Sequence, residues 1–300
     1  MSIANRQEIS DLIVQFDLQS LERKAVKRDD ALKACSSWYA SSVIASIKHK
    51  DGVLCEEDVD RLILSAHSEL QRLWEEFFHA QRVANILTSL VTALRTVGIN
   101  KRLRLVDIGC GIGYVLRWIA AHDILKDDIF LVGVDFNKAL IEQARKLAQS
   151  ENLDVQFYVA NAFDLDEPAD LFISSGVLHH IQREQLPTFF EQQAQCEPLG
   201  FAHFDPQYSW ATPVGSFLFH ISRMRTPLAR YDGWLSAVRA HPALVLNRAA
   251  KNQIKSLDLF RYNPPISWFP LLRTMTGLVG IHPKASTDFE QNLKEPVMRI

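Results

Sequence analysis

The sequence predicts an α/β fold with a doubly wound, mostly parallel sheet. Three observations predict it: short apolar runs alternate with amphipathic segments from residue 102 onward, a glycine-rich turn directly follows the first apolar run, and an acidic residue ends the second. Strands that alternate with helices form parallel sheets covered on both faces. The residues before 99 follow a helical pattern instead, so we expect a separate helical N-terminal region.

Residues 9–98 are expected to be mostly helical. Apolar residues recur there at spacings of three and four, as at Leu70, Leu73 and Phe77, and no proline interrupts the run. A second amphipathic segment covers residues 79–96. Because an amphipathic helix normally buries its apolar face, these stripes are expected to form core.

Strands and helices alternate in the rest of the chain. The predicted strands lie at 102–109, 129–136, 154–160, 170–176 and 200–205, with helices at 113–122, 137–150 and 183–195 between them. Asn137 is a natural N-cap for the second of these helices. Further strand candidates lie at 256–262 and 276–281. The predicted domains are therefore a helical region at 1–98 and a second domain at 99–300, with a helical insertion at about 211–245.

Composition restricts the class of protein. A formal net charge of -2 gives no long-range field that would draw in nucleic acid or anionic lipid, which leaves only a local basic face for that purpose. The four cysteines have no CxxC pairing or zinc-ligand spacing, so no metal site is predicted. The N-terminus lacks a signal-peptide pattern, and no stretch approaches 18 uncharged apolar residues. We therefore expect a soluble, cytoplasmic-type protein.

The glycine-rich turn has the context of a nucleotide-binding loop. The run VDIGCGIGY places Gly109, Gly111 and Gly113 directly after the first strand and at the start of a helix, where glycines let the backbone approach a ligand. Tyr114 occupies the position at which a dinucleotide fingerprint needs a small residue, which argues against a nicotinamide oxidoreductase. The alternative is a tight turn in some other α/β protein.

The second marker is an acid at the carboxyl end of the second strand. Asp135 lies 22 residues past Gly113, near the spacing of about 20 expected for an acid that binds a ribose. Its carboxylate can accept hydrogen bonds from both ribose hydroxyls. The alternative is an aspartate that interacts favourably with the dipole of the following helix.

These residues resemble a known family. The run VDIGCGIG is similar to the first motif of class I S-adenosylmethionine (SAM) dependent methyltransferases, an acidic residue followed by x-G-x-G-x-G. The resemblance covers about residues 101–205 and implies a Rossmann-like, seven-stranded, mostly parallel sheet with a reversed last hairpin. It also implies the cofactor S-adenosyl-L-methionine. SAM carries an ammonium and a sulfonium and no phosphate, so an acidic residue is useful beside it.

The resemblance assigns roles around the cofactor. Asp107 would orient the amino group of SAM, and the methionine part would lie along the loop formed by Gly109, Cys110, Gly111 and Gly113. Asp135 is the acidic residue of the second motif, and Phe136 would flank the adenosine. After the third strand, Asn161, Ala162 and Phe163 stand where the family often has an acid and a small residue. Asn161 departs from that pattern, but its amide oxygen can accept a hydrogen bond from the adenine amino group.

The catalytic candidates follow the fourth and fifth strands. The run DLFISSGVLHHI places Ser174 at the carboxyl edge of the sheet, where ligands bind in open α/β sheets, and His179 and His180 just beyond it. We favour His180 as base or acceptor-orienting residue, with His179 as the alternate and Asp205 beside them. The alternative is that the histidines serve packing or capping.

Two other regions are expected to contribute to the site. In the family, N-terminal helices often cover the cofactor, so His79 and Arg82 are expected to approach it. Tyr208 and Trp210, after the fifth strand, are expected to close over the acceptor. The run NPPI at 263–266 is interpreted as a proline turn.

The sequence thus predicts a SAM-dependent methyltransferase that acts on an oxygen or nitrogen atom of a small molecule. The expected partner is that small-molecule acceptor, with no membrane, and nucleic acid is disfavoured. The basic residues of the insertion, Arg223, Arg225, Arg230 and Arg239, are interpreted as a solvated helix face. The open alternatives are an RNA or protein methyltransferase and a non-catalytic scaffold or binding protein with the same fold.

Overall fold

The computed structural model describes residues 7–17, 19–165, 168–263, 273–293, 295 and 297–300. The chain divides into two compact units. The N-terminal unit comprises Met1–Leu73 and Tyr208–Arg239, and the sheet unit comprises Trp74–Gln207 and Ala240–Ile300. Of the proline turn predicted at 263–266, residues 264–266 lie outside the described residues.

The N-terminal unit is largely helical. Its helices are α1 (Ile9–Ile13), α2 (Arg28–Ala34), α3 (Trp38–Ser46), most of α4 (Glu56–Glu76), α9 (Thr212–Arg223) and α10 (Pro227–Arg239). Two buried acids join its two chain segments. The carboxylate of Asp232 accepts the backbone N–H groups of Ile9 and Ser10 at 2.7 and 3.0 Å. The carboxylate of Glu69 accepts those of Arg225 and Thr226. These bonds satisfy backbone donors that helix starts leave without partners.

A two-stranded hairpin interrupts the stretch that was expected to be mostly helical. Strands β1 (His49–Lys50) and β2 (Val53–Leu54) pair antiparallel. The two residues between them, Asp51 and Gly52, have φ values of 53° and 79°. An Asp-Gly pair is a strong sequence signal for a tight hairpin, because both residues adopt the left-handed region there. This pair could therefore have predicted the hairpin from the sequence.

The central sheet confirms the predicted fold class. Eight strands lie in the order β10-β8-β9-β7-β6-β3-β4-β5, and the strands from β7 to β5 are parallel to one another. Their bounds are β3 (Leu103–Ile108), β4 (Ile129–Asp135), β5 (Gln156–Val159), β6 (Leu171–Ser175), β7 (Gly200–Pro206), β8 (Asp258–Tyr262), β9 (Met275–Ile281) and β10 (Val297–Arg299). Strand β9 runs antiparallel to both β7 and β8, which gives the expected reversed hairpin.

One edge strand was not predicted. The sequence indicated seven strands, whereas the three residues of β10 add an eighth by pairing with β8. Three residues are too few to produce a recognisable alternation of apolar and polar side chains, so only the paired structure reveals this strand.

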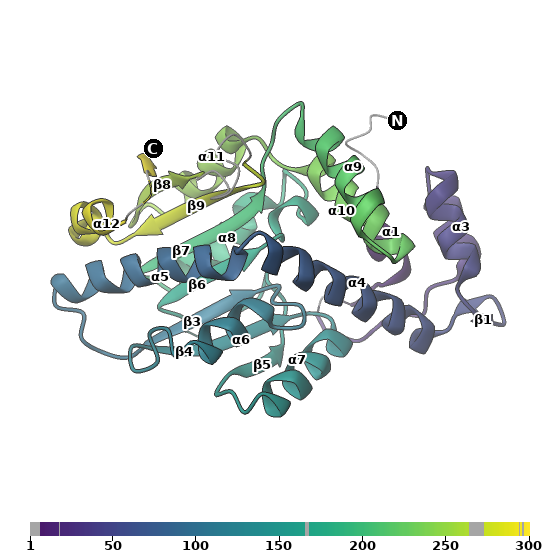
Figure 1. Cartoon of the computed structure of the whole chain (residues 1–300), viewed down its shortest axis with the longest axis horizontal. Coiled ribbons are helices and arrows are strands. Elements are labelled where there is room, and N and C mark those ends of the chain that lie inside the picture. Colours follow the sequence, from purple (N-terminus) through teal and green to yellow (C-terminus); the bar gives the residue numbers. More distant parts are fainter. Residues whose placement is uncertain (1–6, 18, 166–167, 264–272, 294, 296) are drawn as a thin grey trace. The chain divides into compact units, whose positions relative to one another are not determined.

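Helices cover both faces of the sheet (Figure 1). Helices α5 (His79–Thr96), α6 (Tyr114–Ala121), α7 (Lys138–Ser150) and α12 (Ser286–Asn292) pack in one core cluster. Helices α8 (Leu186–Gln195) and α11 (Ala243–Gln253) pack in another. The predicted N-cap is confirmed, since the Asn137 side chain accepts the N–H of Ala139 at 3.0 Å.

The compact units differ from the predicted boundary at residue 98. Helix α5 belongs to the sheet unit, because buried residues such as Leu87 and Leu90 share a core cluster with Leu103 and Leu105 of β3. The helical insertion predicted at 211–245 is also divided: α9 and α10 lie in the N-terminal unit and α11 lies in the sheet unit.

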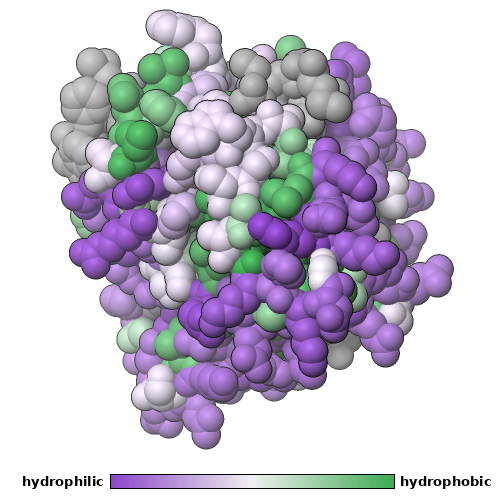
Figure 2. Space-filling model, turned by 90° about the vertical axis from the view of Figure 1, so that its right-hand side faces the viewer, coloured by the Kyte–Doolittle hydropathy of each residue, from purple (hydrophilic) through white to green (hydrophobic). Residues whose placement is uncertain are grey.

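Among the described helices, none combines the length and the apolar character that crossing a bilayer requires. Hydrophilic side chains cover most of the face drawn in Figure 2, with hydrophobic side chains between them. Location in the cell stays a prediction.

Candidate functional site

Most of the predicted site residues gather at the carboxyl edge of the parallel strands in the sheet unit. Strand β3 lies between β4 and β6, with Asp107 opposite Gly133 on one side and Ile173 on the other. The strand order reverses at β3, since β4 and β5 follow on one side and β6 and β7 on the other. Ligands of open α/β sheets bind in the crevice outside the strand ends at such a reversal.

Two positions of the glycine loop, Gly109 and Gly113, leave no space for a side chain. Gly109, Gly111 and Gly113 have φ values of 68°, 55° and 72°, in the left-handed region. A Cβ on Gly109 would lie 2.5 Å from a methyl of Val177, and one on Gly113 would lie 2.4 Å from the ring of Phe157. The loop between β3 and α6 therefore has no room for a side chain at these two positions.

We expect Gly113→Ala to destabilise the sheet unit by roughly 2–5 kcal/mol, because left-handed strain and overpacking add. Phe157 is buried in a core cluster, so a shift of its ring would disturb the surrounding packing. The control is Gly98→Ala, since Gly98 has a φ of 89° but no atom within 4 Å of its added Cβ. The free energy of unfolding of this variant is expected to fall by only about 1 kcal/mol. Urea unfolding of both variants measures the difference. Equal losses would contradict the steric argument.

Asp135 holds the loop from the end of β4. One carboxylate oxygen accepts the N–H of Gly111 at 3.0 Å and the other accepts that of Asn137 at 2.8 Å. The side chain is 7% exposed. Burial raises the pKa of Asp135 to about 6, although the two backbone hydrogen bonds and the charge of His180 act in the opposite direction.

Asp107 is a buried acid whose surroundings fit a cationic group. Burial, and then the charge of Asp135, raise the pKa of Asp107 well above its usual range. Its Oδ1 atom has no hydrogen-bond partner among the described residues. An ammonium group would supply that partner and offset the repulsion between the two acids, whereas a pyrophosphate would increase it. These residues fit SAM and do not fit a dinucleotide.

The affinity for S-adenosylhomocysteine (SAH) should depend on pH. Ribose hydroxyls are donors, so they favour the ionised form of Asp135, and ligand binding below a pH of about 6 must release a proton. We expect a loss of affinity of at least roughly tenfold per pH unit well below 6, because Asp135 and Asp107 must both give up a proton before they bind the ribose and the ammonium group. Calorimetric titration measures it. His180→Gln should move the fall to higher pH, because a cation that lowers the pKa of Asp135 is removed. An SAH affinity that does not change between pH 5 and pH 8 would contradict this prediction.

The residues expected around the adenine differ in exposure. Phe136 is 46% exposed next to Asp135. The amide oxygen of Asn161 accepts the N–H of Phe163 at 3.0 Å, and the Phe163 ring packs edge-on against Phe189 with centroids 6.3 Å apart. Ala162 packs against the same core cluster as Phe163. Phe136 is thus the more accessible of the two aromatic candidates.

The two serines of β6 face opposite sides of the sheet. Ser174 is fully buried, and its hydroxyl lies 2.8 Å from Nδ1 of His203, whose Nε2 lies 2.9 Å from Oε1 of Gln193 in α8. Burial lowers the pKa of His203 to about 3, so this is a neutral hydrogen-bonded chain. Ser175 instead lies 2.8 Å from Nε2 of His79 in α5.

His79 reaches the carboxyl end of β6, as expected for a residue near the site. Its ring lies 4.9 Å from that of Trp74 and 5.6 Å from that of Phe204. Burial and the charge of Arg82 lower the pKa of His79 to about 3, so it is neutral. The Trp74 ring lies 3.5 Å from the position of a Cβ on Gly176. Trp74 lies in the amphipathic stretch that is expected to form core, because its spacing fits a helix stripe equally well.

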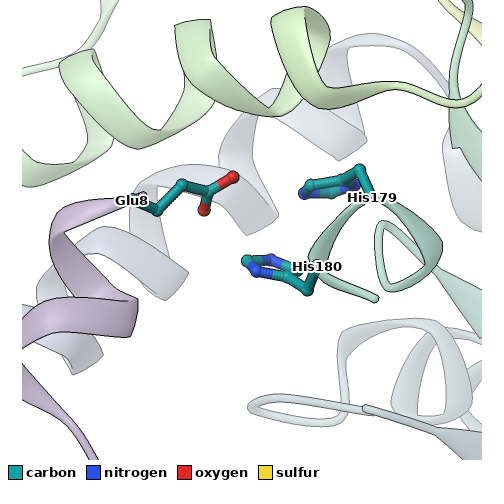
Figure 3. Close-up of side chains that lie close together, drawn as sticks. All are labelled: Glu8, His179 and His180. Atoms are coloured by element: carbon teal, nitrogen blue, oxygen red, sulfur yellow. The ribbon is translucent and has the colours of Figure 1, made fainter. Parts of the chain in front are cut away.

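The structure brings His179 and Asp205 together. His179 lies in the 3-10 turn η2 (Leu178–His180), and its Nδ1 donates to Oδ1 of Asp205 at 2.9 Å. Both side chains are buried, and Oδ2 of Asp205 has no hydrogen-bond partner within the described part of the chain. Figure 3 shows the rings of His179 and His180 next to each other. Their centroids lie 4.3 Å apart. His180 is exposed.

Comparison with known proteins identifies the central part of the sheet unit. A family model described as "Methyltransferase domain" matches residues 105–196. Cyclopropane mycolic acid synthase 1 of Mycobacterium tuberculosis is 31% identical over 100 residues, which are 33% of each chain. Cyclopropane-fatty-acyl-phospholipid synthase of Escherichia coli is 26% identical over 136 residues, 45% of this chain and 30% of that one. The matched part spans about a third of the length of these relatives.

A solved structure shares the fold. The plantazolicin methyltransferase BpumL, in complex with SAH and a pentazolic desmethylPZN analog, aligns with a TM-score of 0.52 at 12% identity, over 76% of this chain and 100% of that one. The family match agrees with three features of the structure: the glycine loop, the acid that ends β4 and the strand order of the sheet. The chain therefore carries a class I, SAM-dependent methyltransferase domain.

Proposed function

We propose that the chain transfers a methyl group from SAM to an oxygen or nitrogen atom of a small molecule. The observation that carries the proposal is the buried pair of His179 and Asp205 at the sheet edge that also holds the glycine loop. SAM supplies an electrophilic methyl group on its sulfonium. Asp107 would bind its ammonium group and Asp135 its ribose, while the backbone of the glycine loop lies along it.

The pair of His179 and Asp205 fits the role of a general base. A carboxylate only accepts, so Asp205 fixes the proton on Nδ1 of His179 and leaves Nε2 as the nitrogen that takes up a proton. A hydroxyl, carboxyl or ammonium acceptor must lose a proton during methyl transfer, and a positioned base typically contributes about 10²–10⁴-fold. This arrangement favours His179, which the sequence had given only as the alternate, and makes the exposed His180 the alternate instead.

A lipid is the second candidate acceptor. The names of the two relatives, a cyclopropane mycolic acid synthase and a cyclopropane-fatty-acyl-phospholipid synthase, both refer to acyl lipids. An acyl chain carries no proton on a heteroatom, so transfer to it would not use His179 in the same way. The charge of -2 supports neither nucleic acid nor an acidic protein as acceptor.

The test supplies SAM carrying a labelled methyl group with two extracts, one of deproteinised small molecules and one of total lipids. Label in a small-molecule product, absent with Asp135→Ala, is the expected result. Label only in the lipid fraction would favour the second candidate. No label in either fraction, from a chain that binds SAH, would favour the non-catalytic alternative.

A further inference from the structure

Helix α9 carries an apolar stripe that is exposed to solvent. Val214, Phe217, Leu218 and Ile221 follow the spacing i, i+3, i+4, i+7, which places them on one face of the helix. They are 60%, 47%, 60% and 52% exposed, and α9 contains no buried residue. A surface helix normally turns such a stripe toward the core.

The face that α9 packs against its neighbour α10 is the more polar one. The Ser216 hydroxyl donates to the carbonyl of Gly233 at 3.0 Å. The ring of His220 lies 2.2 Å from the position of a Cβ on Gly233, so the two helices approach closely there. Of the stripe, Phe217 touches α10 with one edge, at 6.2 Å between its ring centroid and that of Trp234. The stripe is therefore not the core of the N-terminal unit.

The stripe is flanked by an aromatic residue before α9 and by basic residues at the carboxyl end of the helix. Residues 206–231 contain no aspartate or glutamate. Arg223 and Arg225 are exposed at the carboxyl end of α9, and Trp210, which precedes the helix, is 91% exposed. Glu69, an acid of α4 that contacts this segment, is buried and binds backbone N–H groups, so its oxygens face inward.

We propose that residues 208–225 form a docking surface for an anionic phospholipid bilayer. The helix would lie in the plane of the interface, with its apolar stripe in the acyl boundary and its arginines at the headgroup phosphates. Tryptophan and tyrosine gather at such interfaces, which fits Trp210 and Tyr208. This is binding to the surface, since no described helix is suited to cross a bilayer. It does not depend on methyl transfer.

The test is flotation of the full chain with vesicles of phosphatidylcholine, alone or with about a third phosphatidylglycerol. We expect binding to the anionic vesicles, weakened by salt, and at least tenfold weaker binding to the neutral ones. The double variant Phe217→Ser with Ile221→Ser should lose binding at least tenfold. Arg223→Gln and Arg225→Gln should each weaken it roughly fivefold. The control Leu244→Ser removes a similarly exposed apolar side chain from α11 and should change nothing.

Two results would overturn the proposal. One is the absence of binding to anionic vesicles. The other is a dimer, seen by light scattering without vesicles and abolished by the Phe217→Ser, Ile221→Ser variant, because the stripe would then hold a second copy. An unchanged helical circular-dichroism signal and thermal unfolding transition show that each variant is folded. Because flotation needs no SAM, its outcome is separate from that of the methyl-transfer assay.

Discussion

SAH at about 100 times its dissociation constant is expected to stabilise the folded chain by roughly 2.7 kcal/mol, a rise of several degrees in melting temperature. Asp135→Ala should abolish this rise. The carboxylate would accept the ribose hydroxyls, and hydrogen bonds to a charged group contribute about 1.5–3 kcal/mol each, so the affinity should fall at least 100-fold. Scanning calorimetry with and without SAH measures the effect.

The matched control is Asp170→Asn. Its carboxylate also accepts a backbone N–H, that of Arg104 at 2.8 Å, but it precedes β6 at the opposite edge of the sheet. The control should keep the full SAH-induced rise. NAD serves as a parallel ligand and should have no effect, since Tyr114 and the two buried acids disfavour a pyrophosphate. A rise with NAD, or with SAH in Asp135→Ala, would contradict the cofactor assignment.

The sequence predicted the sheet well because its signals are local. Buried parallel strands appear as short apolar runs, and all five predicted parallel strands, such as 129–136, overlap the observed ones. The cap at Asn137 and the left-handed glycines depend only on neighbouring residues. Strand β10 could not be predicted, because it exists only through its pairing with β8.

The division of the chain depends on tertiary packing, which a helical pattern does not contain. An apolar stripe shows that α5 buries one face but does not show what it packs against. The structure places Leu87 and Leu90 in the same core cluster as residues of β3, and α5 belongs to the sheet unit. For the same reason, spacing alone could not separate Trp74, whose ring lies beside His79, from the other apolar residues of its stripe.

The side-chain direction along β6 shows a similar limit. Successive residues of a strand alternate between faces, so only one of Ser174 and Ser175 can point to a given side. Sequence cannot say which, because the choice depends on the helices that cover each face. The structure turns Ser174 toward His203 and α8, and Ser175 toward His79 and α5. Similarly, His179 and Asp205 lie 26 positions apart, and only the adjacent strands β6 and β7 bring them together.

His179→Gln is expected to lower kcat for an acceptor that must lose a proton by roughly 10²–10⁴-fold, while the SAH affinity stays within about twofold. Asp205→Asn should act in the same direction, because an amide can still accept from Nδ1 of His179 but supplies no charge to stabilise the protonated ring. A loss of kcat at an unchanged SAH affinity is not what a purely structural histidine would cause.

His180→Gln makes the comparison decisive, because the two histidines are adjacent in one turn and differ in burial and in their contact with Asp205. If His180→Gln lowers kcat more than His179→Gln, the base is His180, and the pair of His179 and Asp205 fixes the turn instead. If neither change lowers kcat by more than about threefold, methyl transfer proceeds without a base. Positioning of the acceptor beside the methyl group would then account for the rate, as expected for an acceptor that has no proton to lose.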